Sequence, residues 1–245
     1  EIDILVGTHA IITDNTLFSS LGLVVTDEQH RFGVRQRGAL SKKGKRPHVL
    51  VMSATPIPRT LSLIIYGDLD ISIIDELPKG RQKIKTYLVD SSYRTRVYNY
   101  VKKHLDRGLQ GYIVCPLVEE NESELVSAVK YAEEISKKEF ASYSVALLHG
   151  KMKPKEKARI MQEFSEGKIQ LLVSTTVIEV GIDVPNAVIM VIENAERFGL
   201  STLHQLRGRV GRGSVSSSCI LISDAEGETA KKRLEIMCST TDGFK

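Results

Sequence analysis

LVVTDEQH, at residues 23–30, decides the fold class, because an apolar and β-branched run is followed here by two adjacent carboxylates. Buried parallel strands are near-continuous apolar runs, and ligands of open α/β sheets bind beyond the carboxyl ends of the strands. One carboxylate in that place can hold Mg²⁺, directly or through water, and the next can orient or deprotonate an attacking water. Asp27 and Glu28 fit these two roles. A solvated turn after a strand is the alternative, and it explains many isolated Asp-Glu pairs.

A second strand-like run, at residues 49–52, is followed by Ser53-Ala54-Thr55. Ser53 and Thr55 supply two hydroxyls at the carboxyl end of that run, where a group that senses a bound phosphate would lie. The same arrangement, a strand followed by polar side chains, thus occurs twice. This repetition favours a ligand site over a solvated turn.

The run QLRGRVGRG, at residues 205–213, places two cations on a turn that is punctuated by glycines. Arginine is always charged and presents a planar fork of donors. Arg209 and Arg212 can therefore stabilise charge that develops on a transferring phosphoryl group. A solvated basic loop that makes general nucleic-acid contacts is the alternative.

The composition is that of an ordinary globular protein, since 42% of the 245 residues are hydrophobic and 26% are charged. The length fits one or two domains, and the net charge of +4 permits nucleic-acid binding without demonstrating it. Cys115, Cys219 and Cys238 have neither metal-ligand nor disulfide spacing. No apolar run reaches the roughly 18 residues that span a bilayer. The chain opens on Glu1, as if within a domain, so we expect it to be part of a longer protein.

Strand-like and helical patterns alternate along the chain, which predicts a parallel α/β architecture. Strands are predicted at residues 4–6, 23–26, 49–52, 86–89, 112–115, 144–148, 170–174, 187–192 and 218–222. Helices are predicted at residues 93–105, 124–140, 154–164 and 225–237. A proline and a glycine mark a linker at residues 78–81. The predicted organisation is a first domain at residues 1–78, a second at 82–225, and a C-terminal helical segment at 226–245.

Three motifs occur in a fixed order: D-E-Q-H at residues 27–30, S-A-T at 53–55 and Q-x-x-G-R-x-G-R at 205–212. They resemble motifs II, III and VI of superfamily 2 helicases and translocases. Further stretches, at residues 27–34, 53–60, 66–70 and 75–78, are similar to the RecG family of bacterial fork-remodelling helicases. The Mfd family of transcription-repair coupling translocases is the nearest alternative. Mfd typically has D-E-E-H in motif II, so Gln29 favours RecG.

The RecG resemblance implies two RecA-like domains of the P-loop NTPase type, the first of them truncated at its N-terminus. It implies an ATP- and Mg²⁺-dependent double-stranded DNA translocase that remodels stalled replication forks and branch-migrates Holliday junctions in recombination and repair. The implied partners are branched DNA and single-strand-binding protein, and the implied state is a cytoplasmic monomer. The chain contains no G-x-x-x-x-G-K-[ST] loop for the nucleotide phosphates, so we expect these 245 residues alone to be inactive.

In the first domain the resemblance assigns the bound Mg²⁺ to Asp27 and the attacking water to Glu28. It assigns coupling between the nucleotide and the DNA to Gln29, His30, Ser53 and Thr55, and contacts with DNA phosphates to Thr8 and Arg59. Alternatives remain for several of these residues. A β-turn explains the sequence around Thr8, a packed structural histidine explains His30, and an ion pair with an acidic neighbour explains Arg59.

In the second domain the resemblance assigns DNA contacts to His149, Thr175 and Thr176, coupling to Glu179 and Asp183, and catalysis to Gln205, Arg209 and Arg212. Gln205 corresponds to a group that aligns the attacking water or contacts the γ-phosphate, and the two arginines correspond to arginine fingers. A plain strand-to-helix connection is the alternative for His149. For Glu179 and Asp183, the alternative is that the carboxylate caps a turn.

The resemblance implies that ATP closes a cleft between the two domains, so we expect Asp27 and Arg212 to face each other over a shared crevice. An Mfd-like translocase is the second hypothesis. The third is an interaction module that has motif VI and residues 174–185, which resemble motif V, but no nucleotide loop.

Overall fold

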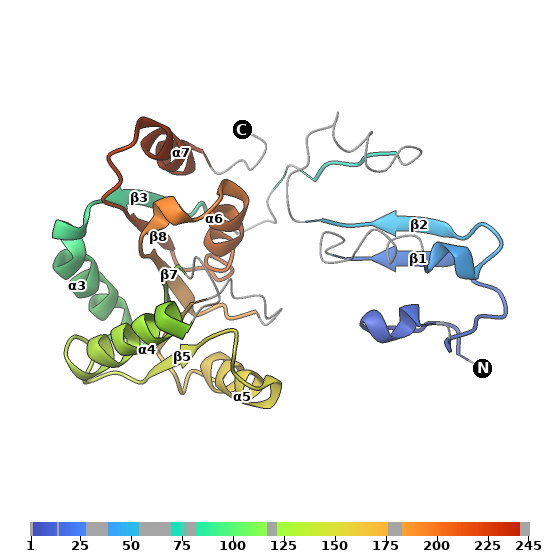
Figure 1. Cartoon of the computed structure of the whole chain (residues 1–245), viewed down its shortest axis with the longest axis horizontal. Helices are drawn as coiled ribbons and strands as arrows, with labels where there is room; N and C mark the ends of the chain where they lie inside the picture. The colour runs from blue at the N-terminus through green and yellow to red at the C-terminus, as the bar shows by residue number, and fades with distance from the viewer. Residues whose placement is uncertain are drawn as a thin grey trace. The chain divides into compact units, whose positions relative to one another are not determined.

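A computed structural model of the chain describes residues 2–13, 15–27, 39–53, 70–74, 76, 82–116, 122–175 and 183–240. The chain divides into two compact units, Glu1–Pro56 and Ile57–Lys245. Figure 1 shows the helices and strands of both. The predicted linker, at residues 78–81, lies outside the described residues, so a domain boundary at that point stays a prediction. No helix within the described ranges is both long and apolar enough to cross a membrane.

The first unit contains two parallel strands, β1 (Leu23–Thr26) and β2 (His48–Val51), and two short 3₁₀ helices, η1 (His9–Ile12) and η3 (Ser41–Lys43). The strand predicted at residues 23–26 is confirmed, and the one predicted at 49–52 begins one residue earlier. Thr26 lies opposite Val51 in the register. The carboxyl ends of the two strands therefore lie side by side.

The strand predicted at residues 4–6 is wrong, because this segment belongs to neither sheet in the described part of the chain. Ile4 and Val6 are 81% and 88% exposed. An apolar run becomes a strand only when its backbone N–H and C=O groups pair with another strand. The apolar residues of this segment do not by themselves indicate whether a partner strand lies beside it.

The second unit is built on a six-stranded parallel sheet with the strand order β3-β8-β7-β4-β6-β5. The strands are β3 (Lys85–Val89), β4 (Gln110–Val114), β5 (Val145–Leu148), β6 (Leu171–Ser174), β7 (Ala187–Ile192) and β8 (Ser218–Ile222). Every residue of the four inner strands is buried. Such strands read as continuous apolar runs because both faces of the sheet are covered. All six predicted strands of this unit are confirmed within one or two residues.

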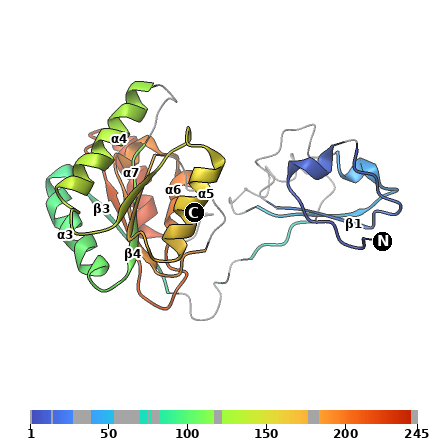
Figure 2. The same ribbon diagram turned by 90° about the horizontal axis from the view of Figure 1, so that it is seen from below.

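Helices cover both faces of this sheet (Figure 2). The helices α5 (Pro154–Ser165), α6 (Leu200–Arg207) and α7 (Glu228–Ser239) share one hydrophobic cluster with one face. The helices α3 (Arg94–Leu105) and α4 (Glu122–Lys137) share a second cluster with the other face. Along β4, Tyr112 and Val114 belong to the first cluster and Ile113 to the second, as the two-residue period of a strand requires. The unit is therefore a three-layer α/β/α structure.

The last helix, α7, packs against β3 and α6 and so belongs to the second unit. Its residues Leu234 and Met237 are buried. The helix predicted at residues 225–237 is thus present, although it begins three residues later and ends two residues later.

Candidate nucleotide and nucleic-acid site

In the first unit, Asp27 and Ser53 lie close together at the carboxyl edge of the two-stranded sheet. Asp27 follows β1 directly, and the Met52 N–H donates to the Thr26 carbonyl at 2.8 Å. Ser53 is the next residue after Met52, and Asp27 and Ser53 are both exposed. The parallel register therefore brings together the acidic motif and the hydroxyl motif that the sequence placed 26 residues apart.

Thr8 precedes η1 in the same unit and is exposed. Threonine before a helix usually accepts a backbone N–H with its side-chain oxygen, but the Thr8 side chain makes no capping hydrogen bond. Its hydroxyl is therefore presented to solvent.

Several predicted site residues lie outside the described residues, so the structure says nothing of them. They are Glu28, Gln29, His30, Thr55, Arg59, Thr176 and Glu179.

The arginine loop of the second unit, residues 208–217, connects α6 to β8 and lies at the amino edge of the sheet, where the strands begin. Asp183 precedes β7, the neighbour of β8, at the same edge. Arg212 Nη1 lies 3.5 Å from Asp183 Oδ1, and Arg212 Nε donates to the Gly208 carbonyl at 3.4 Å. Gln205 lies in the last turn of α6 and leads into this loop. Four predicted residues are thus gathered at one edge: Asp183, Gln205, Arg209 and Arg212.

The positive charges of the arginine loop act electrostatically on a buried core residue, Tyr112 on β4. Burial raises the pKa of the Tyr112 phenol, and the positive charges of Arg209 and Arg212 oppose that rise. Electrostatic effects of this kind fall off with distance.

Two glycines give the arginine loop its path. Gly211 has a φ of +78°, which side-chain-bearing residues rarely adopt. A Cβ on Gly213 would lie 2.6 Å from the carbonyl oxygen of Pro185, which is closer than real Cβ atoms come to backbone. The second glycine therefore allows the loop to lie directly against the segment that carries Asp183.

We expect Gly213→Ala to lower stability by about 1–3 kcal/mol, because the added methyl overpacks the contact with Pro185. Displacement of the loop should also weaken the contact between Arg212 and Asp183. Urea unfolding measures the first effect. Gly22→Ala is the matched control, since a Cβ there meets nothing within 4 Å, and an equal loss in both variants would contradict the role of the close approach.

Two of the predicted DNA-contacting residues of the second unit, His149 and Thr175, lie at the opposite, carboxyl edge. His149 follows β5 and Thr175 follows β6, and the Thr175 N–H donates to the Leu148 carbonyl at 3.1 Å. Burial lowers the pKa of His149, so the ring is neutral at pH 7. Thr175 is only 2% exposed, and its Oγ1 has no hydrogen-bond partner among the described residues. Buried hydroxyls usually have a partner, so the Thr175 hydroxyl is an exception among the described residues.

The two edges of the second sheet thus carry different predicted functions. His149 and Thr175 lie at the carboxyl edge, whereas Asp183, Arg209 and Arg212 lie at the amino edge. The chain from Thr175 to Asp183 connects one edge with the other.

Arg207 is a buried residue of the arginine motif that the sequence patterns did not single out. It is 3% exposed, and its Nη1 donates at 2.8 Å to the carbonyls of Met237 and Thr240. These carbonyls lie at the end of α7, where the last C=O groups of a helix lack intrahelical partners. Arg207 therefore stabilises the packing of α7 on α6, and no local sequence signal distinguishes it from Arg209 or Arg212.

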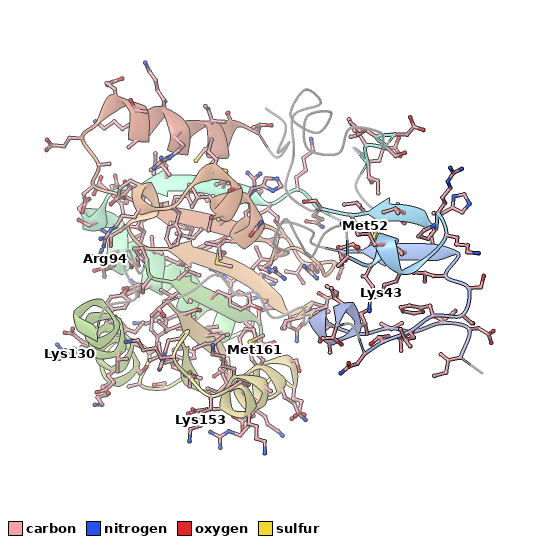
Figure 3. All side chains as sticks on the ribbon, turned by 45° about the vertical axis from the view of Figure 1, so that its right-hand side comes forward. Lys43, Met52, Arg94, Lys130, Lys153 and Met161 are labelled. Atoms are coloured by element: carbon pink, nitrogen blue, oxygen red, sulfur yellow. The ribbon has the colours of Figure 1, made fainter. Side chains whose placement is uncertain are left out.

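A buried carboxylate, Glu193, was also missed. It follows β7, and its side chain is 5% exposed. Arg94 donates to both carboxylate oxygens, at 3.3 and 2.9 Å, and Tyr131 donates to one of them at 2.7 Å. Tyr98 is hydrogen-bonded to Tyr131. The network joins α3 and α4 to the chain that leads into α6 (Arg94 is labelled in Figure 3).

Two family models match the chain. The helicase conserved C-terminal domain matches residues 92–214, and the DEAD/DEAH box helicase matches residues 1–64. The first match covers half of the chain and includes residues 208–214 of the arginine loop.

Curated relatives match the chain from end to end. The ATP-dependent DNA helicase RecG of Bacillus subtilis (strain 168) is 53% identical over 246 residues, which cover 100% of this chain and 36% of that protein. The RecG of Thermotoga maritima is 53% identical over 246 residues, covering 100% of this chain and 32% of that protein. The chain therefore spans about a third of the length of these relatives.

Solved structures agree in fold. A structure of RecG bound to a three-way DNA junction is 50% identical, with a TM-score of 0.81, and covers 100% of this chain and 31% of that chain. Dbp5 of S. cerevisiae, bound to RNA and ADP BeF3, has a TM-score of 0.66 at 17% identity and covers 94% of this chain and 61% of that chain. The second likeness concerns the fold alone. Together they confirm the predicted α/β fold with RecA-like parallel sheets.

Proposed function

Because the chain belongs to the helicases with the conserved C-terminal helicase domain, we propose that it is part of an ATP-dependent motor that moves along double-stranded DNA. The predicted resemblance to RecG is confirmed along the whole chain. The proposed function includes remodelling of stalled forks and branch migration of Holliday junctions, in recombination and repair. RecG-like action is favoured over Mfd-like action by Gln29 and by the RecG relatives.

The observation that carries this proposal is the contact between Arg212 and Asp183 at the amino edge of the second sheet. This contact joins the arginine loop to Asp183. Thr175, which precedes Asp183 in the sequence, lies at the opposite edge of the sheet. Thr175, on the proposed DNA side, and Asp183, on the proposed nucleotide side, are thus close in sequence. A motor needs such a link, because each event at the nucleotide must change the hold on the DNA.

The donor sets fit ATP and Mg²⁺. Arg209 and Arg212 present fixed positive charge and planar donor forks, which suit phosphate oxygens. Mg²⁺ needs only one or two protein carboxylates beside phosphate and water. Asp27 is exposed at a carboxyl strand edge and supplies one.

In this proposal ATP supplies the phosphoryl group whose transfer to water releases the free energy for movement. Glu28 orients and deprotonates the water, and Gln205 aligns it. Arg209 and Arg212 stabilise the charge that develops on the phosphoryl oxygens, which is the largest contribution that residues make to such reactions. The coupling residues of this proposal change the hold on the DNA when the bound nucleotide changes. They are Ser53, Thr55, Gln29, His30, Glu179 and Asp183.

Branched DNA is the proposed substrate, and single-strand-binding protein a proposed partner, of a cytoplasmic monomer. The DNA contacts are proposed for Thr8, Arg59, His149, Thr175 and Thr176. The solved RecG relative was bound to a three-way DNA junction, which supports the choice of substrate.

We expect Glu28→Gln, in a full-length helicase that carries these residues, to lower DNA-stimulated ATP hydrolysis by about 10²–10⁴-fold, because the general base is lost. The Kd for a three-way junction should stay within about twofold, since Glu28 does not contact DNA in this proposal. ATPase assays and fluorescence anisotropy measure the two quantities. Near-normal turnover would reject the role of Glu28. The 245-residue chain alone should show no turnover above background.

A further inference from the structure

Lys43 makes an unusual pair of contacts in the first unit (labelled in Figure 3). Its ammonium group donates to the backbone carbonyl of Thr13 and, at 2.8 Å, to that of Thr16. These carbonyls lie 30 and 27 residues away along the sequence. A lysine has three donors and no acceptor, and here two of them bind the main chain instead of solvent.

The backbone around Lys43 lies against the residues that lead into β1. The Lys43 N–H donates to the Leu40 carbonyl at 3.1 Å, which closes η3. A Cβ on Gly44 would lie only 3.0 Å from the Leu21 carbonyl oxygen, so this turn lies directly against the residues that lead into β1. Lys43 therefore reaches out from a firm base.

Further hydrogen bonds connect the carbonyls that Lys43 binds with Thr8. The Thr16 N–H donates to the Thr13 carbonyl at 3.1 Å, and Thr13 Oγ1 donates to the Ala10 carbonyl at 2.8 Å. The Ile11 N–H donates to the Thr8 carbonyl at 3.1 Å. A continuous set of polar contacts thus leads from the ammonium group to the residue that presents a free hydroxyl.

Among the hydrogen bonds of residues 8–13, 15 and 16, those that Lys43 donates bridge the longest separation in sequence. Lys43 therefore ties the segment that carries Thr8 to η3.

We propose that Lys43 is a positioning residue for DNA binding, which holds residues 8–16 so that the Thr8 hydroxyl meets a DNA phosphate. This inference rests on the proposed function, because it takes the role of Thr8 from there. Lys43 acts through the backbone carbonyls and does not contact the DNA. Its neighbour Lys42 is exposed, whereas Lys43 is half-buried.

The test compares four variants of a full-length helicase that carries this chain: Lys43→Met, Lys43→Arg, Thr8→Ala and the double variant Thr8→Ala/Lys43→Met. Lys42→Met is the matched control, because it removes the same charge from the same short helix. Fluorescence anisotropy with a three-way junction gives the Kd at several salt concentrations. Thermal unfolding of each variant checks that it is folded.

Lys43→Met should raise the Kd about tenfold, as Thr8→Ala should, because a hydrogen bond to a charged phosphate is lost in both. The double variant should bind no more than about twofold more weakly than Thr8→Ala, since coupled residues are not additive. Arginine retains donors for both carbonyls, so Lys43→Arg should restore binding. The slope of log K against log salt should be unchanged, whereas loss of a direct contact between a lysine and a phosphate would reduce it by about 0.9.

The outcomes separate the inference from the function on which it rests. If Thr8→Ala leaves the Kd unchanged, the assigned role of Thr8 fails, and the inference fails with it. If Thr8→Ala weakens binding but Lys43→Met does not, or if their effects add fully, only the inference fails. A reduced salt slope, or an equal loss in Lys42→Met, would also overturn it by indicating simple charge attraction.

Hydrogen exchange gives a second readout if Lys43→Met lowers the melting temperature. Amide exchange at residues 8–16 should accelerate, while exchange in β1 and β2 stays as in the parent protein, because local opening needs less free energy than global unfolding. Uniform acceleration throughout the unit would contradict a positioning role.

Discussion

Arg212→Ala should reduce kcat for DNA-stimulated ATP hydrolysis by roughly 10³- to 10⁵-fold in a full-length helicase that carries this chain, which is the range for arginine fingers. The physical reason is that alanine removes a fixed positive charge from the place where phosphoryl charge develops. Arg212→Lys should recover only part of the loss, because an ammonium group lacks the planar fork of donors. Steady-state ATPase assays at saturating DNA measure the effect.

Binding of DNA to the Arg212→Ala variant should be nearly unchanged, since Arg212 lies at the amino edge of the sheet and His149 and Thr175 at the other. Arg107→Ala is the control for loss of an exposed arginine. A large drop in DNA affinity with little change in kcat would show that the arginine loop belongs to the DNA site. Normal kcat in Arg212→Ala would reject the finger role.

Glu193→Ala should lower the free energy of unfolding by about 1–3 kcal/mol, because it removes the acceptor of the Tyr131 hydroxyl and the partner of the half-buried Arg94. Arg94 and Tyr131 both donate to this carboxylate, and the hydrogen bond to Glu193 raises the pKa of Arg94. Urea unfolding followed by circular dichroism measures the loss. It should be confined to the transition of the second unit, which contains all members of the network.

The matched control is Glu235→Ala, which removes an exposed carboxylate from α7. Surface changes of this kind usually alter stability by less than about 0.5 kcal/mol. Glu193→Gln should lose less than Glu193→Ala, because the amide keeps the size of the side chain and can still accept a hydrogen bond from Tyr131. A cost for Glu193→Ala as small as that of the control would mean that the network does not stabilise the unit.

Most strands of the second unit's sheet were predictable, because buried parallel strands form continuous apolar runs in the sequence. Residues 187–192 and 218–222 were predicted with their exact bounds, and both strands are buried throughout. The run at residues 4–6 has similar letters but no partner strand among the described residues, so the prediction failed. Helix α6 has eight residues, which is too short for a clear 3.6-residue period, and no range was predicted for it.

The candidate site was predictable where one rule of parallel sheets applies. Asp27 and Ser53 each follow a strand of a parallel sheet, so the sequence predicted that they lie at the same edge, and the structure shows that the two strands are neighbours. The same rule does not apply to the arginine loop, which precedes a strand and therefore lies at the amino edge. The contact between Arg212 and Asp183 depends on which strands are neighbours, and strand order is not written in any local pattern.

The sequence by itself determined the α/β class, the strand positions of the second unit and the family, because these depend on short-range periodicity and on the residue types within motifs. Only the tertiary structure decided that Arg207 is buried against α7, that Glu193 is paired with Arg94, and that Lys43 binds the segment carrying Thr8. Each of these contacts joins residues about 30 to 100 positions apart. The identity of a charged residue does not indicate whether its side chain is solvated or buried. Its burial depends on the packing of segments that are distant in the sequence.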